Sequence, residues 1–156
     1  MKTEILEIEK SNALKAFNDG NDGDKTLLKR LFPNTFGNLL ERVFTFEDVC
    51  KEAGINIDYY IVFSDSTDEK EHEIYSNKLK LIYKVFNEGW IPDFSNKNEA
   101  KFFPWFVYEN NGFVLYDVRV YSHISFVGAR LCAKNRRIVE HICKYFLKEY
   151  NDYLLS

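Results

Sequence analysis

The fold is decided by the stretch Lys101-Phe-Phe-Pro-Trp-Phe-Val-Tyr-Glu-Asn-Asn-Gly-Phe-Val-Leu-Tyr-Asp-Val-Arg-Val-Tyr121. Two runs rich in aromatic and β-branched residues flank Asn111-Gly112, a dipeptide typical of a two-residue hairpin turn. Such a turn pairs Asn110 with Phe113 and so fixes which side chains share a face. On this register the core face holds Phe103, Trp105, Val107, Val114, Tyr116, Val118 and Val120. The opposite face holds Phe106, Tyr108, Leu115, Asp117, Arg119 and Tyr121.

A third strand and a closing helix are predicted to follow this hairpin. Residues 126–133 have strand character, and Asn135 is a suitable N-cap for a helix over residues 135–153. The buried stripe of that helix consists of Ile138, Ile142, Phe146, Tyr150 and Tyr153.

The part of the chain before the hairpin reads as helical. Apolar residues at helical spacing predict helices over residues 12–17, 25–32, 45–53 and 68–87, with a further turn or two over residues 38–44. Residues 55–63 are compatible with a strand, a buried turn or a helix. The order predicts an α+β fold. In it, N-terminal helices pack with a three-stranded antiparallel β-meander and a C-terminal helix, in a single globular domain over residues 1–156.

Composition limits the classes of function. Of the 156 residues, 46% are hydrophobic and 17% aromatic, which is enough to build a packed core. The net charge of −3 argues against a bulk electrostatic attraction to nucleic acid or to an anionic membrane. The charged first ten residues do not resemble a signal peptide, and no stretch is long and apolar enough to cross a membrane. Three cysteines without a close pair indicate reduced thiols, and a cytoplasmic location is expected.

The strongest candidate site lies where the third strand meets the last helix. Arg130, Lys134, Arg136 and Arg137 lie there without an acid, although a helix N-terminus favours anions over cations. Together with Arg119 on the neighbouring strand, they could hold a phosphate group or single-stranded nucleic acid. An aromatic surface beside them would consist of Phe106, Tyr108 and Tyr121. The alternative is that these cations pair with Asp117 or with the acids of residues 64–74.

Other chemical signals are weak. The acidic run over residues 19–24 fails as a calcium loop, because Lys29 would occupy the bidentate position. His123, Cys132, His141 and Cys143 lack the spacing of a zinc site. Cys132 is the one candidate nucleophile, with a strand cysteine packed under the helix as the alternative. No catalytic residue, metal or cofactor is therefore expected.

Four phrases carry a resemblance to a known family: Thr45-Phe-Glu-Asp-Val-Cys-Lys-Glu-Ala-Gly-Ile55, Leu81-Ile-Tyr-Lys-Val-Phe-Asn-Glu-Gly-Trp90, Lys101-Phe-Phe-Pro-Trp-Phe106 and Gly128-Ala-Arg-Leu-Cys-Ala-Lys-Asn-Arg136. The chain resembles, over residues 13–154, proteins of unknown function that phages and prophages of gut bacteria encode. Residues 57–68 depart from the pattern and look like a variable insertion. The resemblance implies a small soluble protein made in the cytoplasm of a bacterial host, and it transfers no catalytic residue.

Three functional hypotheses follow. The first is a non-catalytic accessory or binding protein of phage type, whose macromolecular partner is a protein or a single-stranded nucleic acid. The second is a small enzyme that binds a phosphate-bearing substrate at the junction over residues 130–137. The third is a structural homo-oligomer whose aromatic residues build a subunit interface. The lack of an acid–base or metal constellation in the sequence favours the first and the third.

Overall fold

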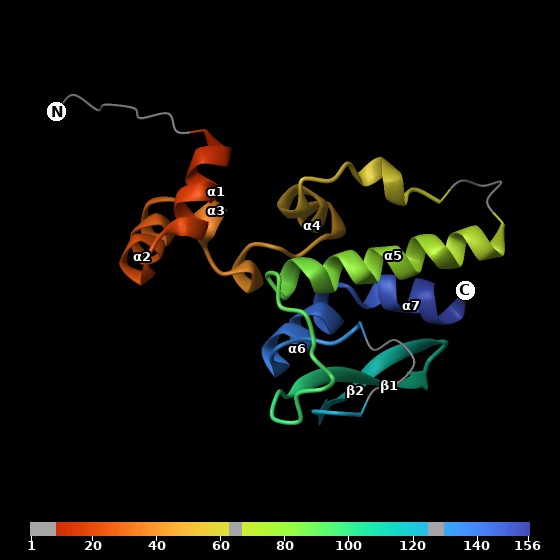
Figure 1. Ribbon diagram of the computed structural model, residues 1–156. Coiled ribbons are helices and arrows are strands. Elements are labelled where there is room, and N and C mark those ends of the chain that lie inside the picture. Colours follow the sequence, from red (N-terminus) through yellow and green to blue (C-terminus); the bar gives the residue numbers. More distant parts are fainter. Residues whose placement is uncertain (1–8, 63–66, 125–129) are drawn as a thin grey trace. The chain divides into compact units, whose positions relative to one another are not determined.

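The structure is a computed structural model that describes residues 9–62, 67–124 and 130–156. The chain forms two compact units, Met1–Arg42 and Val43–Ser156. Figure 1 shows the first unit in red and orange and the second in yellow to blue. The single domain over residues 1–156 therefore stays a prediction.

The first unit consists of the short helices α1 (Lys10–Asp19), α2 (Asp22–Leu31) and α3 (Pro33–Phe36) and the 3-10 turn η1 (Leu39–Glu41). The Asn21 side chain caps α2 by accepting the Gly23 and Asp24 N–H groups at 2.8 and 3.1 Å. The Asp24 carboxylate accepts the Asn21 N–H at 3.1 Å, which completes a capping box. The rings of Phe17 and Phe36 stack at 4.7 Å. The polar run over residues 19–24 is thus a helix-capping turn.

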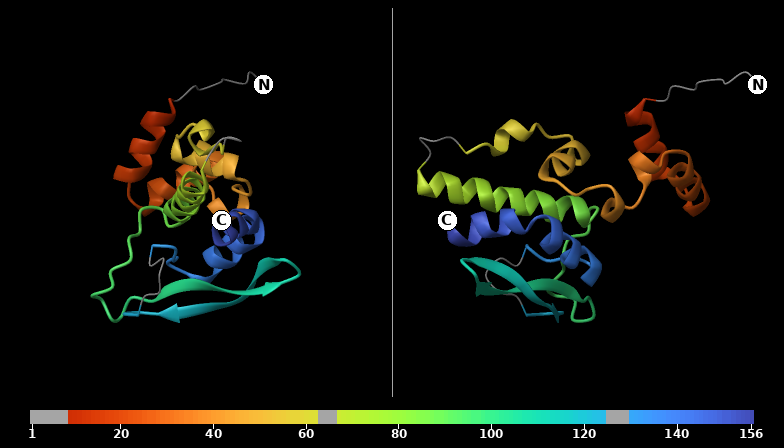
Figure 2. Two further views of the ribbon diagram at one scale, coloured as in Figure 1. Left: turned by 90° about the vertical axis from the view of Figure 1, so that its right-hand side faces the viewer. Right: turned by 180° about the vertical axis from the view of Figure 1, so that it is seen from behind.

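The second unit is layered around the long helix α5 (Asp68–Phe86). The helix α4 (Phe46–Ala53) and the 3-10 turn η2 (Ile57–Tyr60) lie along one side of α5. The helices α6 (Arg136–Tyr145) and α7 (Leu147–Leu155) lie between α5 and the β-hairpin, as the end-on view of Figure 2 shows. Residues 55–63, ambiguous in the sequence, therefore contain a 3-10 turn.

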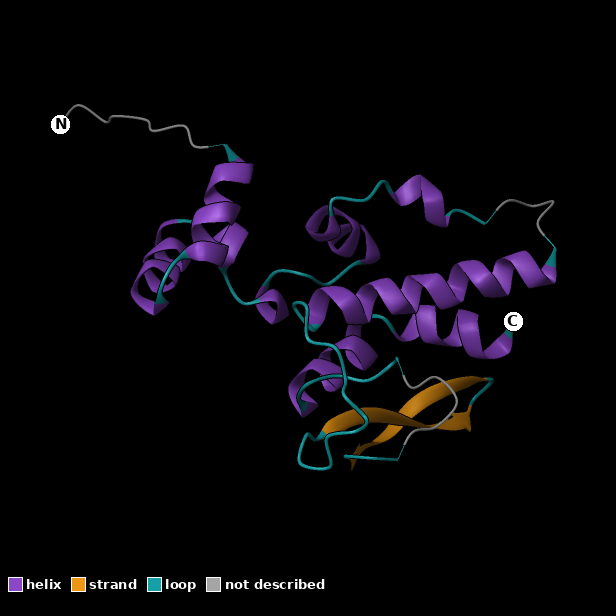
Figure 3. Ribbon diagram, in the orientation of Figure 1, coloured by secondary structure: helices purple, strands orange, loops and turns teal. Residues whose placement is uncertain are grey.

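The hairpin consists of β1 (Lys101–Glu109) and β2 (Gly112–Tyr121), drawn in orange in Figure 3. Its turn lies one residue earlier than predicted, because Glu109 pairs with Gly112. Asn110 and Asn111 form the turn with φ angles of 50° and 64°, a left-handed conformation that asparagine tolerates. A second irregularity, between Trp105 and Phe106, shifts the register again.

These two shifts change which residues face the helices. Phe106, predicted on the open face, packs its ring 4.6 Å from that of Tyr150 in α7. Trp105 and Tyr116, predicted in the core, are 43% and 68% exposed. Their assignment to the core was wrong, because both lie at the second irregularity: Trp105 pairs with Asp117 and Phe106 with Leu115, so the alternation of faces reverses on the turn side of it. Val118 is buried, as predicted.

The prediction of a three-stranded meander was also wrong. Residues 126–129 lie outside the described residues, and the described remainder, residues 130–133, forms no strand. Ala133 makes a single antiparallel bridge to Phe102, with N–H···O distances of 2.9 and 3.0 Å in the two directions. The bridge is to β1 and not to β2, so the connection is not that of a meander. The described sheet is a two-stranded hairpin, and the α+β class is confirmed.

The closing helix is capped as predicted but is not continuous. The Asn135 side chain accepts the Ile138 N–H at 3.0 Å, which confirms the predicted N-cap. The helix breaks at Phe146, whose φ of −120° and ψ of 27° are not helical. The break lets α6 and α7 follow different directions over the hairpin while Phe146 itself stays fully buried.

The core of the second unit lies between α5, α6 and α7. The Phe146 ring meets the Phe86 ring edge to face at 5.8 Å, and Ile142 is fully buried beside them. The buried hydroxyl groups of Tyr83 and Tyr150 lie 2.6 Å apart, so each satisfies the other in an apolar surrounding. Burial raises the pKa of both phenols well above the ordinary value.

Candidate functional site

The structure places the predicted cationic junction among carboxylates. The Arg136 guanidinium donates to the Val118 carbonyl at 2.8 Å and lies 3.7 Å from the carboxylates of Asp117 and Glu140. Arg119 lies 3.4 Å from the same Asp117. The alternative offered by the sequence, pairing with Asp117, is thus present for both arginines. Both guanidinium groups therefore already have a carboxylate partner within the protein.

The remaining three cations of the junction differ from one another. The Lys134 ammonium lies 2.6 Å from the Glu88 carboxylate at the end of α5. Arg130 and Arg137 are exposed and form no ion pair with any described residue. The five predicted cations therefore differ in their surroundings, and Arg130 and Arg137 are the two without an ion-pair partner among the described residues.

The predicted aromatic surface is divided as well. Phe106 packs against α7, whereas the Tyr121 ring lies 6.4 Å from that of Phe103. Tyr108 meets the Phe113 ring edge to face at 5.3 Å at the turn end of the hairpin. These rings do not form one stacking surface.

A groove of about 750 Å³ lies at the end of α5. Of the five predicted cations, Arg130 alone is among its described lining residues. The lining of the groove is mainly apolar and includes three cations. Among the described residues that line it, none carries a carboxylate. We call this cavity the Trp90 groove; it is lined by Lys80, Tyr83, Lys84, Asn87, Gly89, Trp90, Ile91, Pro92, Phe94 and Arg130.

The loop after α5 builds one wall of the Trp90 groove. Gly89 has a φ of 84°, which turns the chain out of the helix, and Pro92 prevents the helix from resuming. The Trp90 indole Nε1–H donates to one Glu99 carboxylate oxygen at 3.3 Å, and the Asp93 N–H donates to the other at 2.9 Å. One carboxylate thus fixes both the ring and the backbone of this wall.

A buried lysine holds the same loop against the sheet. The Lys101 side chain is fully buried, and its ammonium lies 3.0 Å from the Glu99 carboxylate. It donates to the main-chain carbonyls of Glu99 at 3.0 Å and Ser122 at 2.9 Å, and also to those of Asp93 and Asn96. These acceptors come from the loop and from the end of β2, so Lys101 joins the two. The sequence analysis did not identify this role.

A buried amide positions the opposite wall. The Asn87 Nδ2 group donates to the Cys132 carbonyl at 2.8 Å, and its Oδ1 accepts the Lys134 N–H at 3.1 Å. The end of α5 is thereby bound to the segment that begins with Arg130. The groove is consequently a preformed feature held by buried polar contacts, as binding sites usually are.

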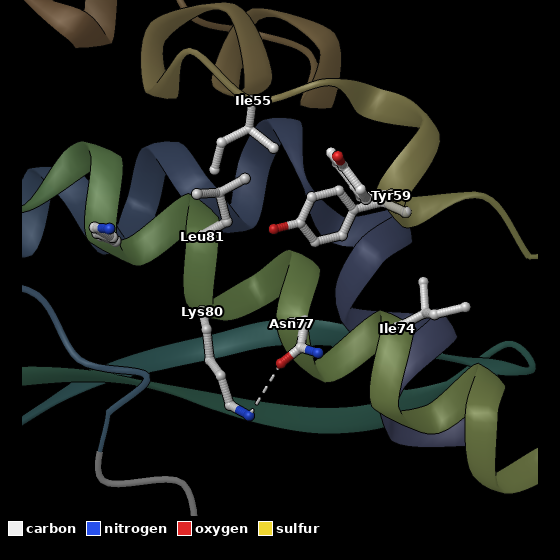
Figure 4. A pocket seen from close by; sticks show the side chains of 8 residues that line it. Ile55, Tyr59, Ile74, Asn77, Lys80 and Leu81 are labelled. Atoms are coloured by element: carbon white, nitrogen blue, oxygen red, sulfur yellow. Dashed lines mark hydrogen bonds between the residues drawn. The ribbon is translucent and has the colours of Figure 1, made fainter.

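A second, smaller cavity of about 420 Å³ lies on the other flank of α5, beside η2. Figure 4 shows that Ile55, Tyr59 and Leu81 surround it. Lys80 and Lys84 line it too, so the two cavities share these lysines. We call it the Tyr59 cavity; its lining consists of Ile55, Tyr59, Tyr60, Ile74, Asn77, Lys80, Leu81 and Lys84.

Cys132, the candidate nucleophile, and His141 are both buried. Burial raises the pKa of the Cys132 thiol to about 12, more than the nearby Lys101 lowers it. Burial lowers the pKa of His141, whose Nε2–H donates to the Val43 carbonyl at 2.8 Å. A thiol with a raised pKa is a poor nucleophile, so Cys132 is a packed core cysteine, although it lies outside any described strand.

In the part of the chain that the structure describes, no group of three or more His, Cys, Asp or Glu side chains is arranged to hold a metal ion. No described helix is long and apolar enough to cross a membrane.

Comparison of the chain with models of protein families, with curated proteins and with solved structures gives no significant match. Any function proposed for the chain therefore has to be argued from the contacts and cavities described above.

Proposed function

We propose that the chain is a non-catalytic binding protein, and that the Trp90 groove takes an acidic peptide segment with an apolar anchor from a protein partner. The resemblance noted in the sequence adds the expectation that it acts as an accessory protein of phage type. The observation that carries the proposal is a mainly apolar lining that includes Lys80, Lys84 and Arg130 and no described carboxylate.

The cations that line the Trp90 groove favour an anionic partner. The chain as a whole carries a net charge of −3, yet the charged residues among the described lining of the groove are all cations. Like charges repel and complementary potentials favour the correct partner, so this local inversion favours an acidic ligand over a basic one. A volume of about 750 Å³ lies in the range of sites that hold a few side chains or a small ligand.

Two features favour a peptide over a nucleic acid. Single-stranded nucleic acid needs a charged track along several phosphates, and three cations on an acidic chain supply little of it. Ile91, which lines the groove, is 81% exposed, and such apolar anchors are typical of protein contacts. The enzyme alternative gains no support from Cys132, because the thiol is fully buried.

The test compares two double variants that change the net charge equally. Lys84→Glu with Arg130→Glu alters the groove, whereas Arg137→Glu with Lys144→Glu alters exposed cations that do not line it. The probe is a fluorescein-labelled Asp-Glu-Asp-Phe peptide, and affinity is read by fluorescence anisotropy. We expect the groove variant to bind about tenfold more weakly or worse and the control to stay within about threefold, because exposed ion pairs contribute up to about 1 kcal/mol each.

Three results would overturn the proposal. One is an equal loss in both variants, which would indicate attraction by net charge alone. Another is a larger loss in the Arg137 and Lys144 control, which would move the site to the predicted junction. The third is an oligothymidylate that displaces the peptide and binds more tightly, which would favour single-stranded nucleic acid.

A further inference from the structure

The two cavities share the side chains of Lys80 and Lys84 in their linings. Lys80 and Lys84 are four residues apart on α5, which places them on the same face of the helix, and both line both cavities. In Figure 4 the Lys80 side chain points away from Ile55 and Tyr59, and its ammonium lies 3.3 Å from the Asn77 Oδ1. The lysines thus form a cationic ridge with the mainly apolar Trp90 groove on one flank and the Tyr59 cavity, where Ile55, Ile74 and Leu81 supply apolar surface, on the other.

Each cavity also has one strongly exposed apolar side chain in its lining. Tyr59 is 79% exposed and lines the Tyr59 cavity, and Ile91 is 81% exposed and lines the Trp90 groove. They are the two most exposed large apolar side chains among the described residues. Exposed apolar groups that flank a common polar centre are characteristic of an interaction surface with two anchor points.

We infer that one peptide segment occupies both cavities at once, with an apolar anchor in each and its acidic residues across the Lys80–Lys84 ridge. This inference rests on the proposed function and specifies its partner. The partner carries the order apolar, acidic, apolar, in an extended conformation.

Helix geometry sets the spacing of the two anchors. An α-helix with its side chains is about 10–12 Å across, and an extended chain advances about 3.3 Å per residue. A segment that crosses α5 therefore needs about three residues between its anchors, which are the acids that meet the ridge. A helical ligand with anchors four residues apart would span only about 6 Å, which is too short to reach both flanks.

The test uses two synthetic peptides against the intact protein. Acetyl-Leu-Asp-Glu-Asp-Phe amide has two anchors, and acetyl-Gly-Asp-Glu-Asp-Phe amide has one, with the same charge and length. We expect the two-anchor peptide to bind about tenfold more tightly, because burying one leucine side chain contributes roughly that factor. A calorimetric titration of each peptide measures the ratio.

Two protein variants then locate the second anchor. Tyr59→Ala removes a wall of the Tyr59 cavity, and Tyr116→Ala removes a similarly exposed tyrosine of the hairpin as a control. Tyr59→Ala is expected to abolish most of the advantage of the two-anchor peptide while leaving the affinity of the one-anchor peptide within twofold. Tyr116→Ala should change neither.

The outcomes separate this inference from the function on which it rests. If both peptides bind with equal affinity, the two-cavity arrangement is wrong and the Trp90 groove remains the site. If the two-anchor peptide gains but Tyr59→Ala leaves that gain intact, the second anchor lies elsewhere and the inference is also wrong. If neither peptide binds, the proposed function and the inference fall together.

Discussion

Replacing Phe146 by alanine is expected to lower the free energy of unfolding by about 3–5 kcal/mol. Phe146 lies at the break between α6 and α7, and its fully buried ring meets that of Phe86 in α5. The truncation therefore loses the burial of a whole aromatic ring and leaves a cavity where three helices meet. Chemical denaturation followed by circular dichroism measures the change.

Ile91→Ala is the matched control for this substitution. Ile91 is a large apolar residue that is mostly exposed, so its truncation should change the free energy of unfolding by less than about 0.5 kcal/mol. A loss below 1 kcal/mol for Phe146→Ala would show that the three helices do not share the core described above.

Replacing Lys101 by methionine is expected to lower the free energy of unfolding by about 1–3 kcal/mol, because the carbonyl groups that accept from its buried ammonium lose their donor. Methionine keeps much of the length and volume of the side chain but donates no hydrogen bond. The carbonyls of Glu99 and Ser122, together with the Glu99 carboxylate, then lose their buried donor. The free energy of unfolding is again measured by denaturation.

Lys101→Met also has a local consequence that its control lacks. Release of Glu99 should loosen the loop over residues 89–99, which would then be cut faster by protease under native conditions. Lys97→Met, an exposed substitution in the same loop, should alter neither stability nor cleavage. If Lys101→Met is as stable and as resistant as Lys97→Met, the buried ammonium does not hold the loop.

Local signals made the helix ends predictable. The Thr45 side chain accepts the Asp48 N–H at 3.2 Å, and the Asp48 carboxylate accepts the Thr45 N–H at 3.1 Å, which is a capping box at the start of the predicted helix over residues 45–53. Gly54 closes that helix with a φ of 67°. These contacts involve residues within a few positions of each other, so the sequence contains all the information they need.

The hairpin register depended on a distant residue instead. Asn110-Asn111 and Asn111-Gly112 are both suitable turns, and the neighbouring sequence does not choose between them. The Asn151 side chain of α7 accepts the Phe113 N–H at 2.6 Å and donates to the Phe113 carbonyl at 3.0 Å. Any side chain at Gly112 would begin only 3.1 Å from the Asn151 Oδ1, so glycine serves this helix contact and not the turn.

The candidate site was only partly visible in the sequence. Arg130 was identified, but the Trp90 groove also needs α5 and the loop after it, which lie some 40 to 50 residues earlier in the chain. One signal was present: residues 74–87 contain three lysines and no acid, and the apolar run Trp90-Ile-Pro92 follows them. The role of Lys101 had no such signal, because its acceptors are main-chain carbonyls that the fold brings together.

The most direct measurement is the NMR signal of the two tryptophan indole N–H groups during titration with the Asp-Glu-Asp-Phe peptide. The chain has two tryptophans, Trp90 in the groove and Trp105 on the hairpin. The Trp90 signal should shift progressively to saturation, because the peptide binds beside its ring, while the Trp105 signal stays in place. A shift of Trp105 with Trp90 unmoved would contradict the account and would assign binding to the sheet.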